Sequence, residues 1–312
     1  MFSVIFPGQG SQIVGMTSEL YSTYSLFKRN FEEADEILKF SLSKKILEGP
    51  AEELNKTENT QPAIFLVSYS IYQLMCNQLN IRLDKAKFFA GHSLGEYTAL
   101  ACSGAISFAD AIKILNERGK AMQTSVSENK GGMLVILGTR FDEIEKIIKE
   151  NDISCYIAND NSNNQVVVSG YKEHINKFSE LLLKKKIKNL KLPVSAPFHC
   201  KLMHKATEIM KDKLKNINFK DLSVPIISNV TANVVNDKNE LFDLLIRQIE
   251  GRVRWRESIN LMVNNGIDHF IEIGPGKVLS NLIKRFDKNL KVNAINDEKD
   301  ISDLNFNDQF KK

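Results

Sequence analysis

The stretch from Phe88 to Leu100 reads FFAGHSLGEYTAL. An apolar run that ends at a glycine predicts a buried strand, and the run that begins near Glu96 predicts a helix. Between them Ser93 stands two residues from a glycine on either side. A Gly-x-Ser-x-Gly turn between a strand and a helix is the nucleophile-elbow pattern, in which glycine permits a very tight turn. The stretch therefore predicts an α/β fold with Ser93 as a nucleophile; the alternative is a glycine-rich turn with a capping serine.

Backbone N–H groups at a helix N-terminus lack partners and can bind an oxyanion as a serine attacks a carbonyl. The N–H group of Leu94 is the natural donor here. The turn Gly8-Gln9-Gly10 follows the strand-like run FSVIF and is a second candidate for this task. It does not match a dinucleotide fingerprint, because the third glycine would fall at Ile13. The alternative for this turn is a simple flexible connection.

A serine nucleophile needs a base. The chain has five histidines, which are His92, His174, His199, His204 and His269. The first adjoins Ser93 and should point away from it, the second lies in a charged helix, and the last opens a strand. We favour His199, which ends the loop LPVSAPFHC, because loops at domain junctions often carry function. His204 remains a second candidate for the base, although it lies in a predicted helix and can face solvent.

Arg118 interrupts an apolar pattern. The apolar residues of its predicted helix are spaced to form one stripe and comprise Phe108, Ala111, Leu115 and Met122. Arg118 falls three residues after Leu115 and four before Met122, so it lies on the face that should meet the core. A buried guanidinium needs an anionic partner. The alternatives are an anionic ligand, a structural ion pair, or an arginine that reaches solvent from the edge of the stripe.

The order of predicted elements indicates two domains. Strand, helix, strand, strand, helix and strand follow one another from Gly131 to Ser195, which is the ferredoxin-like pattern. Strand-then-helix units flank this segment. We therefore expect a discontinuous large α/β domain of residues 1–126 and 197–312, interrupted by a small ferredoxin-like domain of residues 127–196.

Further elements are expected from their patterns. They are a strand over Phe2–Phe6, a helix from a capping Thr17 to about Phe40, a buried helix over Gln61–Leu79, a helix over Phe108–Gln123 and a strand over Val224–Val230. The tail after Asn296 is polar, and we expect it to be loosely packed.

Composition excludes several classes of protein. The chain has 312 residues, 43% hydrophobic and 26% charged, with a formal charge of +4, and no dense basic block indicates nucleic-acid binding. The four cysteines form no CxxC pair, which argues against a zinc site or a disulfide framework. The N-terminus lacks the features of a signal peptide, and the apolar run Ala63–Met75 is too short to span a bilayer. We therefore expect a cytoplasmic protein that contacts neither nucleic acid nor membrane.

Six motifs together resemble one family. They are FPGQGSQ near the N-terminus, GHSLGEYTAL, RGKAMQ, PFHCKLM, RQI followed by VRW, and IEIGPGKVL. In this order they resemble the malonyl-CoA:acyl carrier protein transacylases of bacterial fatty acid synthesis, from Phe6 to Leu279. The resemblance implies an α/β-hydrolase-like large domain with a ferredoxin-like insert and ping-pong acyl transfer.

The resemblance also implies roles for individual residues. Ser93 would be acylated, with His199 as its base, and the backbone carbonyl of Gln248 would orient the histidine. Gln9 and Leu94 would supply oxyanion N–H groups. Arg118 would pair with the malonyl carboxylate. The implied partners are malonyl-CoA and the holo form of acyl carrier protein, with no cofactor or metal, and we expect a monomer.

One departure and several alternatives remain. The family often has Pro-Gly where this chain has Asn163-Asn164, two residues that tolerate left-handed backbone. A free-standing polyketide-type acyltransferase, a serine hydrolase or thioesterase, and a non-catalytic carrier-binding module are the alternatives; Phe198 resembles the malonyl-selective form. A cluster of lysines could attract an acidic carrier protein or be a solvated helix end, and comprises Lys184, Lys185, Lys186 and Lys188.

Overall fold

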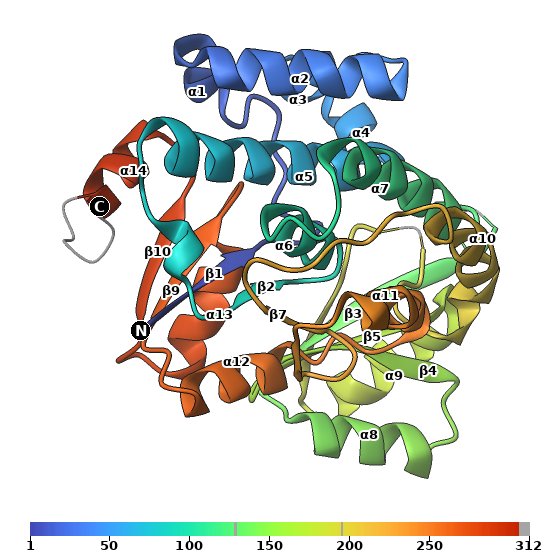
Figure 1. The fold of residues 1–312 in the computed structure, drawn as a ribbon. Helices are drawn as coiled ribbons and strands as arrows, with labels where there is room; N and C mark the ends of the chain where they lie inside the picture. Colours follow the sequence, from blue (N-terminus) through green and yellow to red (C-terminus); the bar gives the residue numbers. More distant parts are fainter. Residues whose placement is uncertain (128–129, 195, 306–312) are drawn as a thin grey trace.

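The computed structural model describes residues 1–127, 130–194 and 196–305. Their strands form two sheets, which lie side by side in Figure 1. The larger sheet has the order β10-β9-β1-β2-β7-β8 and is parallel except for β8, which runs antiparallel to β7. Its strands are β1 (Phe2–Phe6), β2 (Phe89–Gly91), β7 (Ile226–Ile227), β8 (Val234–Val235), β9 (His269–Ile273) and β10 (Lys291–Ile295).

The smaller sheet is antiparallel throughout, with the order β4-β5-β3-β6. Its strands are β3 (Gly131–Leu137), β4 (Cys155–Ser162), β5 (Gln165–Tyr171) and β6 (Lys188–Lys191). The helices α8 (Phe141–Glu150) and α9 (Lys172–Lys184) connect them, so the predicted alternation of strands and helices is observed. The predicted strand through Ser195 is shorter than expected, and residue 195 itself lies outside the described residues.

Helices cover both faces of the larger sheet (Figure 1). Besides α8 and α9, the helices are α1 (Ser18–Thr23), α2 (Ser25–Leu38), α3 (Leu42–Leu47), α4 (Ala51–Leu54), α5 (Thr57–Gln73), α6 (Leu94–Cys102), α7 (Phe108–Gln123), α10 (His204–Leu214), α11 (Leu241–Glu250), α12 (Trp255–Asn264), α13 (Val278–Phe286) and α14 (Glu298–Asn305). A π-helical segment, Leu74–Gln78, continues α5, and short 3-10 turns occupy Leu83–Lys85, Lys201–Met203 and Lys238–Glu240.

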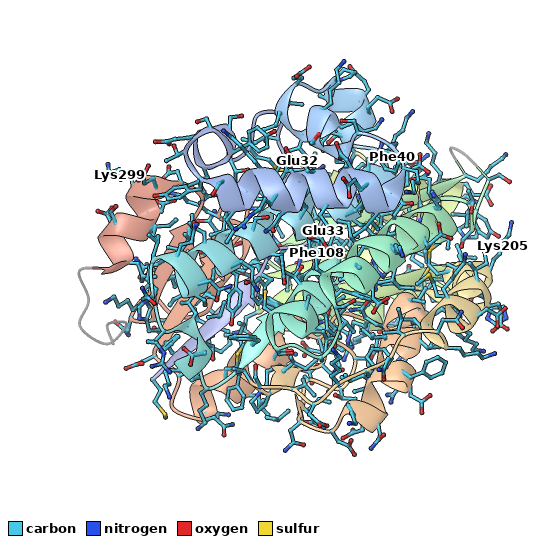
Figure 2. The ribbon with its side chains drawn as sticks, turned by 45° about the horizontal axis from the view of Figure 1, so that its top comes forward. Glu32, Glu33, Phe40, Phe108, Lys205 and Lys299 are labelled. Carbon is cyan, nitrogen blue, oxygen red and sulfur yellow. The ribbon has the colours of Figure 1, made fainter. Side chains whose placement is uncertain are left out.

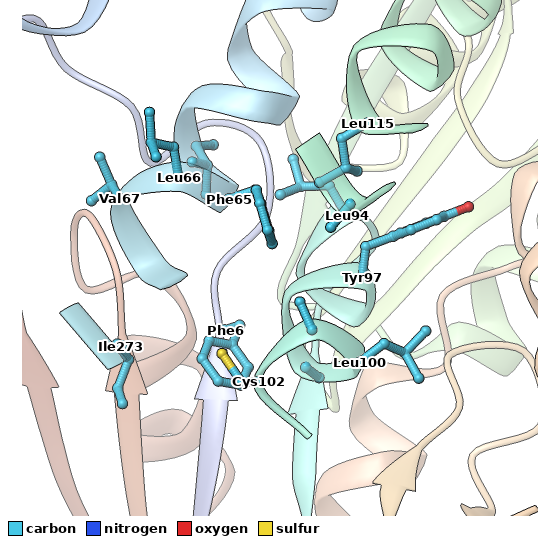
Figure 3. Packing of buried hydrophobic residues seen from close by; sticks show 14 of the residues in the cluster. Phe6, Phe65, Leu66, Val67, Leu94, Tyr97, Leu100, Cys102, Leu115 and Ile273 are labelled. Atoms are coloured by element: carbon cyan, nitrogen blue, oxygen red, sulfur yellow. The ribbon is translucent and has the colours of Figure 1, made fainter. Parts of the chain in front are cut away.

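The main core lies between the large sheet and α5, α6 and α7. Phe6 of β1, Phe65 of α5 and Leu100 of α6 point into it and are fully buried (Figure 3). Above this layer, α2 crosses α5 and α7, and Phe108 at the start of α7 stacks on Phe65 (Figure 2). A second cluster fills the opposite face beneath α12 and α13, and a third lies between the small sheet and α8 and α9. The strand β2 is therefore buried on both faces, which fixes the turn at its end.

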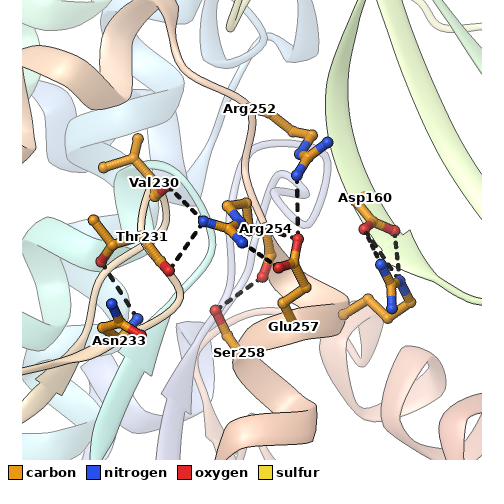
Figure 4. Close-up of polar contacts among 9 residues, drawn as sticks. Asp160, Val230, Thr231, Asn233, Arg252, Arg254, Glu257 and Ser258 are labelled. Atoms are coloured by element: carbon orange, nitrogen blue, oxygen red, sulfur yellow. Dashed lines mark hydrogen bonds and ion pairs between the residues drawn. The ribbon is translucent and has the colours of Figure 1, made fainter. Parts of the chain in front are cut away.

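A partly buried ion pair joins the small sheet to α12. Asp160 of β4 is fully buried, and its carboxylate accepts hydrogen bonds from Arg256 of α12, with Nη2 2.8 Å from Oδ2 and Nε 3.0 Å from Oδ1 (Figure 4). Backbone bonds from Asp160 N–H to Val253 O and from Val253 N–H to Ala158 O reinforce the joint. The small sheet is thus fixed against the segment that leads into α12.

Three predictions are wrong. The long helix predicted from Thr17 to about Phe40 is two helices, α1 and α2, because the backbone is extended at Tyr24. Thr17 makes no side-chain cap, and the Tyr24 hydroxyl bonds Glu298. The strand predicted over Val224–Val230 has only two residues. The tail after Asn296 forms α14, because Ile301 and Leu304 lie one turn apart and are both buried. Residues 306–312 of that tail lie outside the described residues.

Candidate active site

The turn between β2 and α6 is as tight as the glycine spacing predicts. A Cβ atom at Gly91 would lie 1.9 Å from Gly95 O, and one at Gly95 would lie 2.3 Å from Phe6 O, so neither position admits a side chain. Ser93 has φ 55° and ψ −109°, a conformation that non-glycine residues rarely adopt. The turn places Ser93 directly before Leu94, the first residue of α6. As in the first turn of any helix, the N–H group of Leu94 has no carbonyl within the helix to bond.

Ser93 and His199 are in contact. Ser93 Oγ lies 2.8 Å from His199 Nε2, and His199 Nδ1 lies 2.9 Å from the backbone oxygen of Gln248. A carbonyl oxygen can only accept, so Nδ1 carries the proton and Nε2 presents its lone pair to the serine hydroxyl. Burial, reinforced by the nearby Arg118 cation, lowers the pKa of His199 to about 3. The imidazole is therefore neutral near pH 7 and able to accept a proton.

The other histidines bond elsewhere. His92 Nε2 lies 3.0 Å from Asn161 Oδ1 of β4, so this ring faces the small sheet. His204 is exposed and pairs with Glu250. His174 bonds the backbone oxygen of Ser154, and His269 bonds Asn293 Oδ1.

Arg118 is 1% exposed, as its position on the apolar stripe predicts. Its Nη1 donates to Gln61 Oε1 at 2.7 Å, and its Nη2 donates to Gln248 Oε1 at 2.8 Å and to Ser93 Oγ at 3.2 Å. All three acceptors are neutral, and within the part of the chain that the structure describes no carboxylate forms an ion pair with this guanidinium. This buried cation beside the serine is therefore paired with no carboxylate of the described residues.

A cavity of about 100 Å³ lies over Ser93, His199 and Arg118. Gln9 and Leu94 line it from the large-sheet side, and residues of the small sheet line the opposite side. The structure therefore brings all six residues singled out from the sequence, Gln248 included, to one place. Among the described residues no cluster of His, Cys, Asp and Glu is suited to a metal ion.

Two side chains that the sequence did not single out also support the elbow. Asn229 Oδ1 accepts from Ser93 N–H at 2.7 Å, and its Nδ2 donates to Gly91 O at 2.7 Å, so one amide spans the turn. Glu96 bonds both Asn229 and Gln248. No sequence signal marks Asn229, which lies 136 positions from Ser93 along the chain.

The turn at Asn163-Asn164 differs from expectation. Both residues are exposed, and neither has the left-handed backbone that asparagine tolerates. The turn is instead supported by Ser162 Oγ, which donates to Asn164 Oδ1, and by Gly138 N–H, which donates to Asn164 O.

Residues 3–306 match the model of the acyl transferase domain. The chain belongs to the acyl transferase family. It is 42% identical to the malonyl CoA-acyl carrier protein transacylase of Bacillus subtilis (strain 168) over 95% of this chain and 94% of that one. It is 38% identical to the Escherichia coli (strain K12) protein of the same name, over 95% and 96% of the two chains.

Solved structures of acyl transferases also resemble this chain. An acyl-carrier-protein-S-malonyltransferase from Bartonella henselae has a TM-score of 0.93 and 39% identity over 97% of this chain and 98% of that one. A malonyl-transacylase in complex with its type II PKS acyl-carrier protein has a TM-score of 0.92 and 36% identity over 96% and 97%. Among the described residues, no helix has the length and apolar character that a membrane crossing requires.

Proposed function

We propose that this acyl transferase moves a malonyl group from malonyl-CoA to the phosphopantetheine thiol of holo acyl carrier protein, and so supplies fatty acid synthesis in the cytoplasm. The observation that carries the proposal is Arg118, a buried cation beside the Ser93–His199 pair that forms no ion pair with any carboxylate in the described part of the chain. A guanidinium binds both oxygens of a carboxylate at once. Acetyl and malonyl thioesters differ by one carboxylate, so this cation selects malonyl.

The reaction proceeds in two half-reactions. Ser93 Oγ attacks the thioester carbonyl while its proton passes to His199 Nε2, and the N–H groups of Leu94 and Gln9 bind the oxyanion. The carbon–sulfur bond then breaks, and coenzyme A leaves with the proton from His199. In the second half-reaction, the carrier thiol gives its proton to His199 and attacks the malonyl ester, and Ser93 recovers the proton as it leaves. The Gln248 carbonyl holds the imidazole in the tautomer that both halves need.

We propose the same domain division for this chain as its sequence predicts. An α/β-hydrolase-like large domain of residues 1–126 and 197–312 carries Ser93, Arg118 and His199, and a ferredoxin-like domain of residues 127–196 covers the cleft. The antiparallel order β4-β5-β3-β6 supports this division, as does the segregation of the third hydrophobic cluster into the small sheet.

Incubation with labelled malonyl-CoA and holo acyl carrier protein tests the proposed function. We expect intact-mass measurement to show malonyl on the carrier, none on the apo carrier, which lacks the thiol, and little acetyl from acetyl-CoA. Release of free malonate without malonyl carrier would indicate a hydrolase instead. A type II polyketide carrier in the same assay tests the second candidate, which the likeness to the polyketide complex favours.

A further inference from the structure

Glu96 is a buried carboxyl group that the proposed reaction does not use. It lies three residues after Ser93 in the first turn of α6 and is 1% exposed. Burial raises its pKa to about 7, against the lowering effect of hydrogen bonds from Gln248 and Asn229. A buried carboxyl is costly unless its oxygens accept hydrogen bonds. The groups that donate hydrogen bonds to Glu96 therefore indicate which residues it acts on.

The hydrogen bonds of Glu96 lead to the two residues that hold the elbow. Oε2 accepts from Gln248 Nε2 at 2.5 Å, and Oε1 accepts from Asn229 N–H at 3.3 Å. The second bond is long, and Asn229 has its own bonds to Gly91 and Ser93. The contact with Gln248 is therefore the one through which Glu96 acts on the site.

The amide of Gln248 has a defined orientation. Its Nε2 donates to Glu96 and, at 2.9 Å, to Ser93 O, while its Oε1 accepts from Arg118 Nη2 at 2.8 Å. Rotation of the amide by half a turn would face its NH₂ group to the guanidinium, so that two donors met. The orientation of the amide is therefore fixed by two acceptors at Nε2, Glu96 and Ser93 O, and by one donor at Oε1, Arg118. Glu96 is the stronger of the two acceptors because it can carry charge.

We propose that Glu96 is a positioning residue that holds the Gln248 side chain with Nε2 on Ser93 and Oε1 on Arg118. This inference rests on the proposed malonyl transfer. Glu96 and Arg118 attract one another but form no direct ion pair, because Gln248 lies between them. Glu96 therefore does not take the place of the substrate carboxylate at the guanidinium, whose Nη2 also faces Ser93 Oγ.

Replacement of Glu96 tests the role. Glu96→Leu keeps most of the volume but removes the acceptor, and we expect malonylation of Ser93 to slow by about 100-fold and the malonyl-to-acetyl ratio to fall. Glu96→Gln keeps one oxygen for Gln248 and should recover the rate to within about 10-fold of the wild type. Glu96→Leu combined with Gln248→Leu should be no slower than Gln248→Leu alone, because the two residues act along one path.

Glu272→Leu is the matched control. Glu272 is also fully buried and accepts two backbone N–H bonds, from Leu279 and Ser280, but it caps α13. This variant should lower the melting temperature and leave the acylation rate of the folded enzyme unchanged. The proposal would be overturned if Glu96→Leu acylates at the wild-type rate. It would also be overturned if the rate losses of Glu96→Leu and Gln248→Leu multiply in the double variant.

Two further outcomes are decisive. If Glu96→Leu does not fold, Gln248→Leu alone tests the same contact, and an unchanged rate and ratio in that variant would overturn the proposal. If the wild-type enzyme forms no malonyl ester at all, the proposed function fails, whereas normal acylation in both wild type and Glu96→Leu defeats only the role of Glu96.

Discussion

Arg118 Nη2 lies 3.2 Å from Ser93 Oγ, so the cation and the nucleophile are direct neighbours. In a malonyl ester the carboxylate carbon lies three bonds from Oγ, which places it within reach of the same guanidinium. The Tyr97 ring, 5.4 Å from the guanidinium carbon, and the amides of Gln61 and Gln248 hold the cation in place. Substrate choice and acyl transfer thus depend on one cluster of contacts.

Arg118→Ala should lose malonyl transfer by about 100-fold or more, because a two-pronged bond to a charged group is lost. Acetyl transfer should fall much less, and Arg118→Lys should recover only part of the malonyl preference, since an ammonium cannot bind both oxygens in the same plane. The ratio of the two rates is measured beside the melting temperature. An unchanged ratio with a lowered melting temperature would show that Arg118 is only structural.

His199→Ala should slow acylation of Ser93 by about 10²–10⁴-fold, the usual cost of losing a general base. His204→Ala is the matched control, because this exposed histidine lies five residues further on and pairs with Glu250 rather than Ser93. Stopped-flow acylation rates with circular dichroism of each variant make the comparison. A slow His204→Ala and a normal His199→Ala would reverse the assignment.

Acylation should persist into mildly acidic solution. Burial and the Arg118 cation lower the pKa of His199 to about 3 from its ordinary 6.5, so its neutral, proton-accepting form remains dominant as pH falls between these values. A solvent-exposed histidine would be protonated over the same range. Because the pKa of Glu96 is raised to about 7, the rate of malonyl-Ser93 formation is measured in Glu96→Gln, where position 96 does not titrate, and from pH 8 to pH 5 it should show no decline centred on 6.5. A decline centred on 6.5 would contradict the lowered pKa and show that His199 titrates as a hydrated histidine does.

Asp160→Asn should destabilise the joint between the small sheet and α12. The side chain is fully buried, and the substitution weakens two charge-assisted bonds to Arg256, which costs about 2 kcal/mol. Asp142→Asn removes an exposed pair with Arg140 and should cost roughly 0–1 kcal/mol. Denaturant unfolding of both variants gives the comparison. Equal losses would show that the Asp160–Arg256 pair does not stabilise the joint.

Local patterns predicted much of the fold. The helix over Phe108–Gln123 is observed with the predicted bounds, because serine capping, an apolar stripe and a polar end all agree. The break at Tyr24 and the helix of the tail were missed, since Tyr24 bonds Glu298, 274 positions away, and the tail helix depends on the burial of Ile301 and Leu304. No residue near position 24 has the backbone preference of glycine or proline that marks a helix end.

The residues of the site likewise fall into those that a local sequence pattern marks and those that it does not. Ser93 and Arg118 stand out locally, one through flanking glycines and the other through a charge on an apolar stripe. Gln248 came only from the family resemblance, and Asn229 was not foreseen. Both act on Ser93 across more than a hundred positions of sequence, and an amide side chain has no pattern of its own that reveals such a contact.

The most direct test of malonyl transfer is the intact mass of the protein after mixing with malonyl-CoA alone. The Ser93–His199 pair and the buried Arg118 cation predict that the wild-type chain gains one malonyl group, and that holo acyl carrier protein then removes it. Ser93→Ala should gain none while retaining the wild-type circular dichroism spectrum. A wild-type chain that gains no mass, or a Ser93→Ala variant that still gains it, would contradict the account.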